Sequence, residues 1–168
     1  MAGLTAPADN TAPAGQTIAA DGWFPAIETE AVRQTVRLGE GTVTDARRGA
    51  AIEGAVPSAL RALAAWRSVH AAAGIAQLDQ VTPDEIGGRN LAVVIWERII
   101  RFYAAAELAD MHADVSATDD GMDRDEEKRD AADMYRRKAY EAVADMRAIG
   151  AVTPAAIAAS ARNRVELI

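Results

Sequence analysis

The segment from Thr44 to Ala73 constrains the fold of this chain more than any other, because its apolar residues recur at the spacing of one helix face. Thr44 is a good N-cap, since its hydroxyl can accept a hydrogen bond from a first-turn N–H, and Gly74 is placed to end the helix. Pro57 removes one backbone hydrogen bond, so the sequence predicts a long amphipathic helix that kinks or splits. The predicted apolar stripe consists of Ile52, Val56, Ala59, Leu60, Leu63, Trp66, His70 and Ala73.

Two further segments show helical periodicity, from about Asn90 to Ala113 and from about Glu126 to Gly150. The first of them has two nearly opposite apolar faces, so it is either the central helix of the domain or has one face against another subunit. β-forming residues are sparse and alanine is abundant. The sequence therefore predicts an all-α fold, with three long helices forming a helical bundle, short flanking helices, and extended N- and C-terminal arms. The two faces are Leu91, Val94, Ile95, Ile99, Phe102, Ala106 and Ala109 on one side, and Val93, Trp96, Ile100 and Tyr103 on the other.

The chain divides into an N-terminal arm (residues 1–20), a helical domain (residues 21–161) and a C-terminal tail (residues 162–168). The arm is rich in Ala, Thr, Pro and Gly without periodicity, and it is either disordered or ordered only against a neighbour. The domain opens with Trp23 and Phe24, which either fill the base of the core or cap a subunit contact.

Three short helical elements are expected around the long helices. Pro25 suits the first turn of a helix that runs to about Val36. Residues 82–85, Thr-Pro-Asp-Glu, have the pattern of one capped helical turn that Gly87 and Gly88 then break. Residues 153–161 begin with a Thr-Pro pair and form a short alanine-rich helix.

The C-terminal tail has the pattern of an extended strand, because apolar Val165 and Leu167 alternate with polar Arg164 and Glu166. A lone strand cannot satisfy its own backbone, so the tail either frays or adds to the edge of a partner's sheet, and we favour docking. The candidate interface residues of the whole chain are Trp23, Phe24, Trp96, Ile100, Tyr103, Arg162, Arg164, Val165, Leu167 and Ile168.

Charge and composition exclude several classes of protein. The net charge of −7 and a pI near 4.8 argue against a general nucleic-acid binder or a binder of anionic membranes. The absence of cysteine excludes disulfides, thiolate metal sites and thiol nucleophiles. No apolar run is long enough to span a bilayer, and the N-terminus lacks the pattern of a signal peptide. The simplest interpretation is a soluble protein that is made in the cytoplasm.

The residues predict neither an active site nor a cofactor or metal site. His70 lies on an apolar stripe and is expected to be a hydrogen-bonded structural histidine, whereas His112 suits the negative end of its helix. The acidic loop over residues 116–127 has Ser116 at the first position of an EF-hand pattern and Asp123 at the apolar eighth position, so we expect no calcium site. Phosphate-binding glycine loops, paired-histidine zinc motifs and nucleophile elbows are all missing. The sequence therefore predicts a protein that is not an enzyme.

The order of landmarks along the chain resembles the head-completion protein (gpL) family of contractile-tailed bacteriophages. The resemblance covers nearly everything after the N-terminal arm, and it depends on the order and spacing of many short motifs. These are Asp21-Gly22-Trp23-Phe24-Pro25, Arg33, Arg37, Gly41-Thr42-Val43-Thr44, Leu63-Ala64-Ala65-Trp66-Arg67, Gly74, Leu78, Val81, Ile86-Gly87, Ala104 to Leu108, and Val165-Glu166-Leu167-Ile168.

The resemblance implies a structural virion protein, assembled in the host bacterial cytoplasm. Such a protein is a head–tail connector adaptor, and it forms a homo-oligomeric ring, twelve-fold like the portal, under the portal once DNA is packaged. The ring helps to retain the genome and offers a surface to a neck or tail-terminator protein. Packaged double-stranded DNA would pass through it without sequence-specific binding, for which an acidic lining is suitable. The alternative is a small cytoplasmic helical regulatory or binding module that acts as a dimer, and an enzyme is the third hypothesis.

Overall fold

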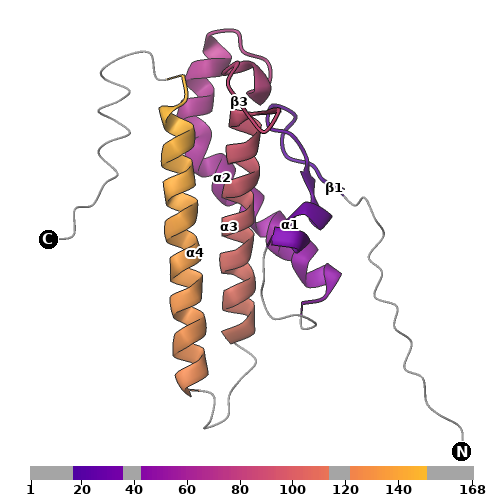
Figure 1. Cartoon of the computed structure of the whole chain (residues 1–168), viewed down its shortest axis with the longest axis vertical. Helices are drawn as coiled ribbons and strands as arrows, with labels where there is room; N and C mark the ends of the chain where they lie inside the picture. Colours follow the sequence, from indigo (N-terminus) through magenta and orange to yellow (C-terminus); the bar gives the residue numbers. More distant parts are fainter. Residues whose placement is uncertain (1–16, 36–42, 114–121, 151–168) are drawn as a thin grey trace, which may run out of the picture.

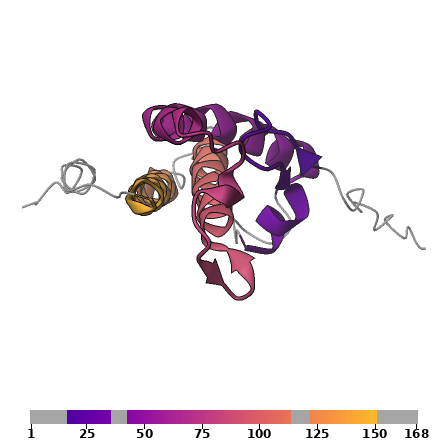
Figure 2. The same cartoon turned by 90° about the horizontal axis from the view of Figure 1, so that it is seen from above.

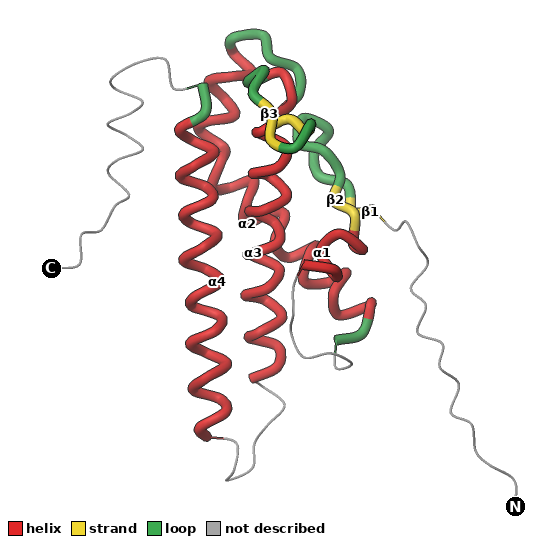
Figure 3. Tube along the Cα trace, viewed as in Figure 1, coloured by secondary structure: helices red, strands yellow, loops and turns green. Residues whose placement is uncertain are grey.

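The structure is a computed structural model that describes residues 17–35, 43–113 and 122–150. Three long helices dominate it, as the sequence predicts: α2 (Asp45–Ala72), α3 (Leu91–Ala113) and α4 (Met122–Ala148) (Figure 1). Around them lie a short helix, α1 (Thr29–Thr35), a 3-10 turn (Leu78–Gln80) and four two-residue strands, which Figure 3 distinguishes from the helices. The all-α prediction is confirmed.

Helix α2 begins and ends where the sequence predicts. The hydroxyl of Thr44 accepts a hydrogen bond from the backbone N–H of Arg47 at 3.3 Å, and Gly74 follows the C-terminus with φ +88°. Pro57 does not split the helix, which is continuous over 28 residues. Figures 1 and 2 show instead that α2 changes direction along its length, with one part crossing α3 and the other running beside it. A proline in the helix interior is the usual cause of such a bend.

Helices α3 and α4 form an antiparallel hairpin. Arg98 of α3 pairs with Asp145 of α4 at 3.3 Å, and Arg136 of α4 pairs with Asp110 near the other end of α3. The contact surface of α4 is small and apolar, and its buried residues are Ala132, Ala139, Ala142, Val143 and Met146. Because alanine side chains are short, the two helix axes can approach closely.

The C-terminal end of α4 is fixed to α2. The indole N–H of Trp66 donates to the carbonyl of Ile149 at 3.2 Å, and the Arg147 guanidinium donates to the carbonyl of Ala62. Gly150 ends α4 with φ +69°, as predicted, and a Cβ at this position would lie 2.8 Å from Cε1 of His70. Glycine is therefore needed here for both its backbone conformation and its size.

The N-terminal segment packs against α3 rather than forming the predicted helix from Pro25. Strand β1 (Thr17–Ile18) pairs antiparallel with β2 (Ile27–Glu28), with Ile18 opposite Ile27. The Pro25 carbonyl accepts a hydrogen bond from the indole of Trp96 at 3.1 Å, and α1 begins only at Thr29. The prediction of a helix from Pro25 is wrong because this tertiary contact and the strand pairing fix residues 25–28 in an extended conformation.

The predicted helical turn over residues 82–85 is also wrong. The chain there leads into a hairpin of β3 (Glu85–Ile86) and β4 (Arg89–Asn90), which pair antiparallel. Gly87 and Gly88 have φ values of +59° and +73°, as a type I′ hairpin turn requires of both central residues. Asn90 then caps α3, since its side-chain oxygen accepts hydrogen bonds from the next residues, Ala92 and Val93.

One hydrophobic core joins the three long helices with α1, β2 and the 3-10 turn. Its largest fully buried side chains are Phe24, Ile52, Leu63, Leu78, Trp96, Ile99, Ile100 and Met146. The predicted stripe of α2 is confirmed in its first part, whereas Trp66 and His70 are half-buried and Ala73 is exposed. The first 16 residues of the predicted arm, the helix predicted at residues 153–161 and the tail at residues 162–168 lie outside the described residues.

Candidate interaction surface

Four of the candidate interface residues lie inside the subunit. Trp23, Phe24, Trp96 and Ile100 are all buried, with Trp96 and Ile100 fully so. Phe24 stacks on Trp96 with ring centroids 4.3 Å apart, and Trp23 meets Phe24 edge to face at 4.8 Å. The indole of Trp23 donates to the carbonyl of Ile75 at 3.0 Å. These residues attach the N-terminal segment to α3, and they present little surface to a second chain.

Tyr103 is the candidate that reaches the surface among the described residues. It is half-buried and meets Tyr140 of α4 edge to face, with ring centroids 6.2 Å apart. Burial raises the pKa of the Tyr103 hydroxyl above its usual value. Tyr140 itself is 60% exposed and was not predicted as an interface residue. In the sequence, Tyr140 could have been recognised as an aromatic residue that lies outside the apolar stripe of a highly charged helix.

The remaining candidates are in the tail, and the structure does not describe them. Arg162, Arg164, Val165, Leu167 and Ile168 all lie outside the described residues, so their docking stays a prediction.

Other exposed apolar side chains belong to the β3–β4 hairpin and to the long helices. Ile86 is 57% exposed in the hairpin, which projects away from the helices in Figure 2. Val69 of α2 is exposed as well, and Met111 and Met134 are exposed at lower levels on α3 and α4. Exposed apolar side chains of this kind are available for contact with another protein.

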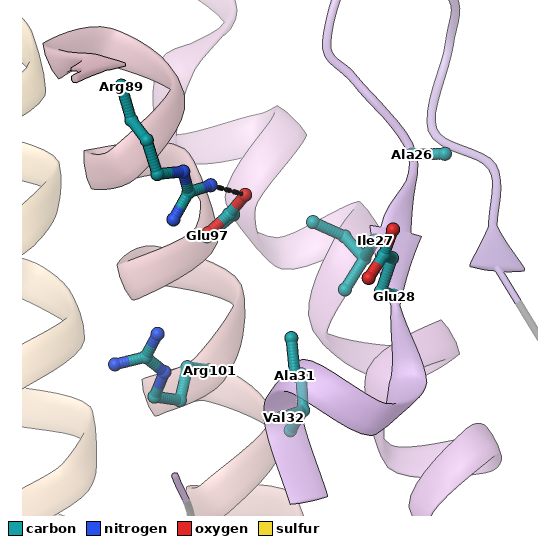
Figure 4. A pocket seen from close by; sticks show the side chains of 8 residues that line it. All are labelled: Ala26, Ile27, Glu28, Ala31, Val32, Arg89, Glu97 and Arg101. Carbon is teal, nitrogen blue, oxygen red and sulfur yellow. Dashed lines mark hydrogen bonds and ion pairs between the residues drawn. The ribbon is translucent and has the colours of Figure 1, made fainter. Parts of the chain in front are cut away.

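A cavity of about 280 Å³ lies between α3 and the β2–α1 segment (Figure 4). Its walls are partly apolar, with Ile27 and Val32 on one side, and its α3 side carries an ion pair between Arg89 and Glu97. Arg101 also lines it, and its buried Nε–H has no hydrogen-bond partner among the described residues. The full lining is Ala26, Ile27, Glu28, Ala31, Val32, Arg89, Glu97 and Arg101.

The groups considered for chemistry do not form a reaction centre in the described part of the chain. His70 packs edge to face on Trp66 with ring centroids 4.5 Å apart, and burial lowers the pKa of its imidazole. Its imidazole makes no hydrogen bond to a described residue, contrary to the expectation of a hydrogen-bonded histidine. Among the described residues, no group of three His, Asp or Glu side chains is placed to hold a metal ion.

The fold and its surfaces define a class of protein. Three packed helices present a projecting hairpin, exposed aromatic and apolar side chains, and surface ion pairs. No helix in the described ranges is long and apolar enough to cross a membrane. The fold is therefore that of a helical-bundle protein with exposed apolar side chains on several elements.

Comparison with known proteins identifies the family. The family model for the phage head completion protein (GPL) matches residues 18–157, most of the chain, and this chain therefore belongs to that family. It is also similar to the "Head completion/stabilization protein" of Escherichia phage P2, at 33% identity over 99 residues. That match covers 59% of this chain and 58% of the relative. No solved structure matches this chain. The family is that of phage head completion proteins, so the chain has a structural role in completing the phage head.

Proposed function

We propose that this chain completes the phage head by assembling into a ring under the portal after DNA packaging. The ring retains the genome and provides the docking surface for a neck or tail-terminator protein. The observation that carries this proposal is the family match over residues 18–157. Ring formation, the twelve-fold copy number and assembly in the host cytoplasm follow from the resemblance to head–tail connector adaptors and belong to the proposal.

The shape of the subunit supports a role in assembly. Its core is closed within one chain, so the subunit can fold before it joins a ring. Ile86 on the hairpin, and Tyr140 and Val69 on the helices, then remain exposed on different elements. A ring subunit needs surfaces on more than one side, because it contacts two neighbours and an axial partner.

The charge of the chain supports a channel through which DNA passes. A net charge of −7 per subunit repels the phosphate backbone, so DNA is not retained by ionic contacts with the lining. A positively charged lining would hold the duplex and slow its ejection.

The competing proposal is a dimeric regulatory module that binds a small molecule. Two cavities in the described part of the chain have volumes of about 280 and 260 Å³. Both are smaller than the ~300–1,000 Å³ typical of ligand pockets. Cavities of this size give little support to a ligand site. The exposed apolar side chains, by contrast, are suited to contacts with another protein.

The test is the completion of filled heads that lack this protein. Heads of the same phage, packaged in its absence, are incubated with the purified full-length chain, and DNase protection and tail attachment are measured. The full-length protein is expected to restore both. If the heads keep their DNA and accept tails equally well without it, head completion is excluded.

The tail provides a second arm of this experiment. We propose that residues 162–168 fasten the subunit to the portal or to an adjacent neck protein, because Val165 and Leu167 alternate with polar Arg164 and Glu166 as in a strand with one apolar side. A chain that lacks residues 162–168 is expected to keep its helicity and melting temperature but not to enter filled heads. Normal incorporation of this truncated chain would exclude docking through the tail.

A further inference from the structure

The side of α3 that carries Arg101 gathers several cations, although the chain as a whole is acidic, and Glu97 on this side is paired with Arg89. Arg98 and Arg101 lie three residues apart and are neighbours on the helix. Arg98 and Lys138 both lie over the ring of Phe102, at 5.6 and 5.8 Å from its centroid. We call Arg98, Arg101 and Lys138 the basic face.

Arg101 is the arginine of this face that lacks a partner among the described residues, and Lys138 lies over the rings of Phe102 and Tyr135. Arg98 is paired with Asp145, whereas Arg101 makes neither a hydrogen bond nor an ion pair with any described residue. Its Nε is buried, so its stem is held in place. Figure 4 shows its guanidinium directed away from Ile27 and Glu28, which lie across the cavity. A guanidinium that is held in place and has no partner is preorganised to bind a carboxylate from another molecule.

The outer side of α4 carries two carboxylates without a partner in the described part of the chain and one, Asp133, that pairs with Arg136 at 2.8 Å. Glu141 and Asp130 are exposed, and neither has a partner among the described residues. Ala132 and Ala139 are buried about half a turn around the helix from Glu141, so Glu141 faces away from α3. Asp133 is exposed on the same side, and the exposed Arg137 lies between Asp133 and Glu141, four residues from each. We call Asp130, Asp133 and Glu141 the acidic stripe.

Arg101 and Glu141 lie at nearly the same level along the bundle. The Arg98–Asp145 pair fixes the register of the antiparallel helices. Arg101 follows Arg98 by three residues, about 4.5 Å, and Glu141 precedes Asp145 by four residues, about 6 Å in the same direction. A rotation about an axis parallel to the bundle keeps every atom at its level. Such a rotation therefore brings Glu141 of one copy to within about 1.5 Å of the level of Arg101 in the next by the Arg98–Asp145 pair, and to within about 6 Å by the Arg136–Asp110 pair, which is within reach of an arginine side chain.

The two surfaces also lie on different sides of the molecule. Figure 4 shows α3 between α4 and the β2–α1 segment, so the acidic stripe and the cavity side of α3 cannot meet within one subunit. A contact between two different surfaces of identical chains is head-to-tail, and it repeats around a ring when the rotation closes.

We infer that the basic face of one subunit binds the acidic stripe of the next, with Glu141 of one chain paired to Arg101 of its neighbour. This inference rests on the proposed ring and names the surfaces that build it. The partner is a second copy of the chain, because the complementary charge and the matching level are both present in the same subunit.

The test is a charge exchange measured on rings. Wild-type protein and variants are mixed with the portal of the same phage, and ring-bearing portals are counted in electron micrographs. Arg101→Glu and Glu141→Arg are each expected to reduce ring formation by about tenfold or more, because like charges then face each other at every subunit boundary. The double variant restores the opposite charges and is expected to recover most of the rings.

Two controls have matched chemistry outside the contact. Arg61→Glu reverses an exposed arginine of α2, and Glu53→Arg reverses an exposed glutamate of the same helix. Both are expected to form rings at close to the wild-type level. If circular dichroism shows that Arg101→Glu is unfolded, Arg101→Gln is used in its place. This variant removes the charge without reversing it, so a loss of rings from a folded Arg101→Gln protein reports an assembly defect rather than misfolding.

The outcomes separate this inference from the proposed function. Normal rings from both Arg101→Glu and Arg101→Gln would overturn the contact and leave the ring itself standing. Loss of rings in both single variants without recovery in the double variant would show that Arg101 and Glu141 are not partners. If the wild-type protein forms no rings on the portal, the proposed ring fails and the contact with it.

Discussion

At the scale of single residues, Leu63 tests whether the core is assigned correctly. Its side chain is fully buried in the hydrophobic core. Leu63→Ala is expected to lower the free energy of unfolding by about 2–5 kcal/mol, because it removes buried methyl groups and leaves a cavity. Val69→Ala on the same helix is the control, since Val69 is 69% exposed and should cost less than about 0.5 kcal/mol. Chemical denaturation measures both, and equal costs would mean that the apolar face is misassigned.

His70 predicts how stability depends on pH. Burial lowers the pKa of its imidazole below 6.5, so the unfolded chain binds more protons than the native one just below that pH. The contribution of His70 is therefore fully present above about pH 6.5 and is lost as the pH falls through the lowered pKa. Because the side chain is only half-buried, the effect is small.

The measurement for His70 is the difference in melting temperature between about pH 7.5 and about pH 5.5. The wild-type protein should lose more stability over this interval than His70→Asn, whose side chain does not titrate. An equal or larger loss in the variant would contradict the assignment.

At the scale of elements, the α3–α4 contact depends on small side chains. Ala139 is fully buried against α3, so Ala139→Leu should destabilise the protein by about 1–3 kcal/mol through overpacking. Ala148 is exposed near the end of α4, and Ala148→Leu should change stability by less than about 0.5 kcal/mol. Thermal unfolding of the two variants compares them directly. A tolerated leucine at position 139 would mean that the helices do not approach closely there.

The long helices were predictable because their signals are local. The N-cap at Thr44 and the terminating Gly74 and Gly150 each depend on neighbours within a few residues, and each is confirmed. The hairpin was missed because Thr82 and Pro83 resemble a helix start, whereas the two following glycines determine the turn. The start of α1 was missed because it depends on Trp96, a residue 71 positions away from Pro25.

The candidate surface was only partly predictable. Two apolar faces on α3 indicate burial on both sides, but periodicity does not tell whether the second face meets the same chain or another one. In this protein the second face of α3 is covered by the N-terminal segment, which includes Phe24 and residues 26–32. Trp96 and Ile100 therefore belong to the subunit core. Arg101 and Glu141 could not be singled out from sequence, since their importance depends on the register between α3 and α4.

At the scale of the whole molecule, the proposed function requires a subunit that folds alone and then assembles. The family match makes it a head completion protein, and the exposed surfaces of α3, α4 and the hairpin are available for its neighbours. On this account, variants of the core should lower stability, whereas variants of the basic face and the acidic stripe should lower assembly at unchanged stability.

The most direct test of this account is electron microscopy of the purified protein mixed with the portal of its own phage. The account predicts a closed ring of subunits coaxial with the portal, with a central opening wide enough for double-stranded DNA. A stable dimer that binds a small molecule and does not associate with the portal would contradict it.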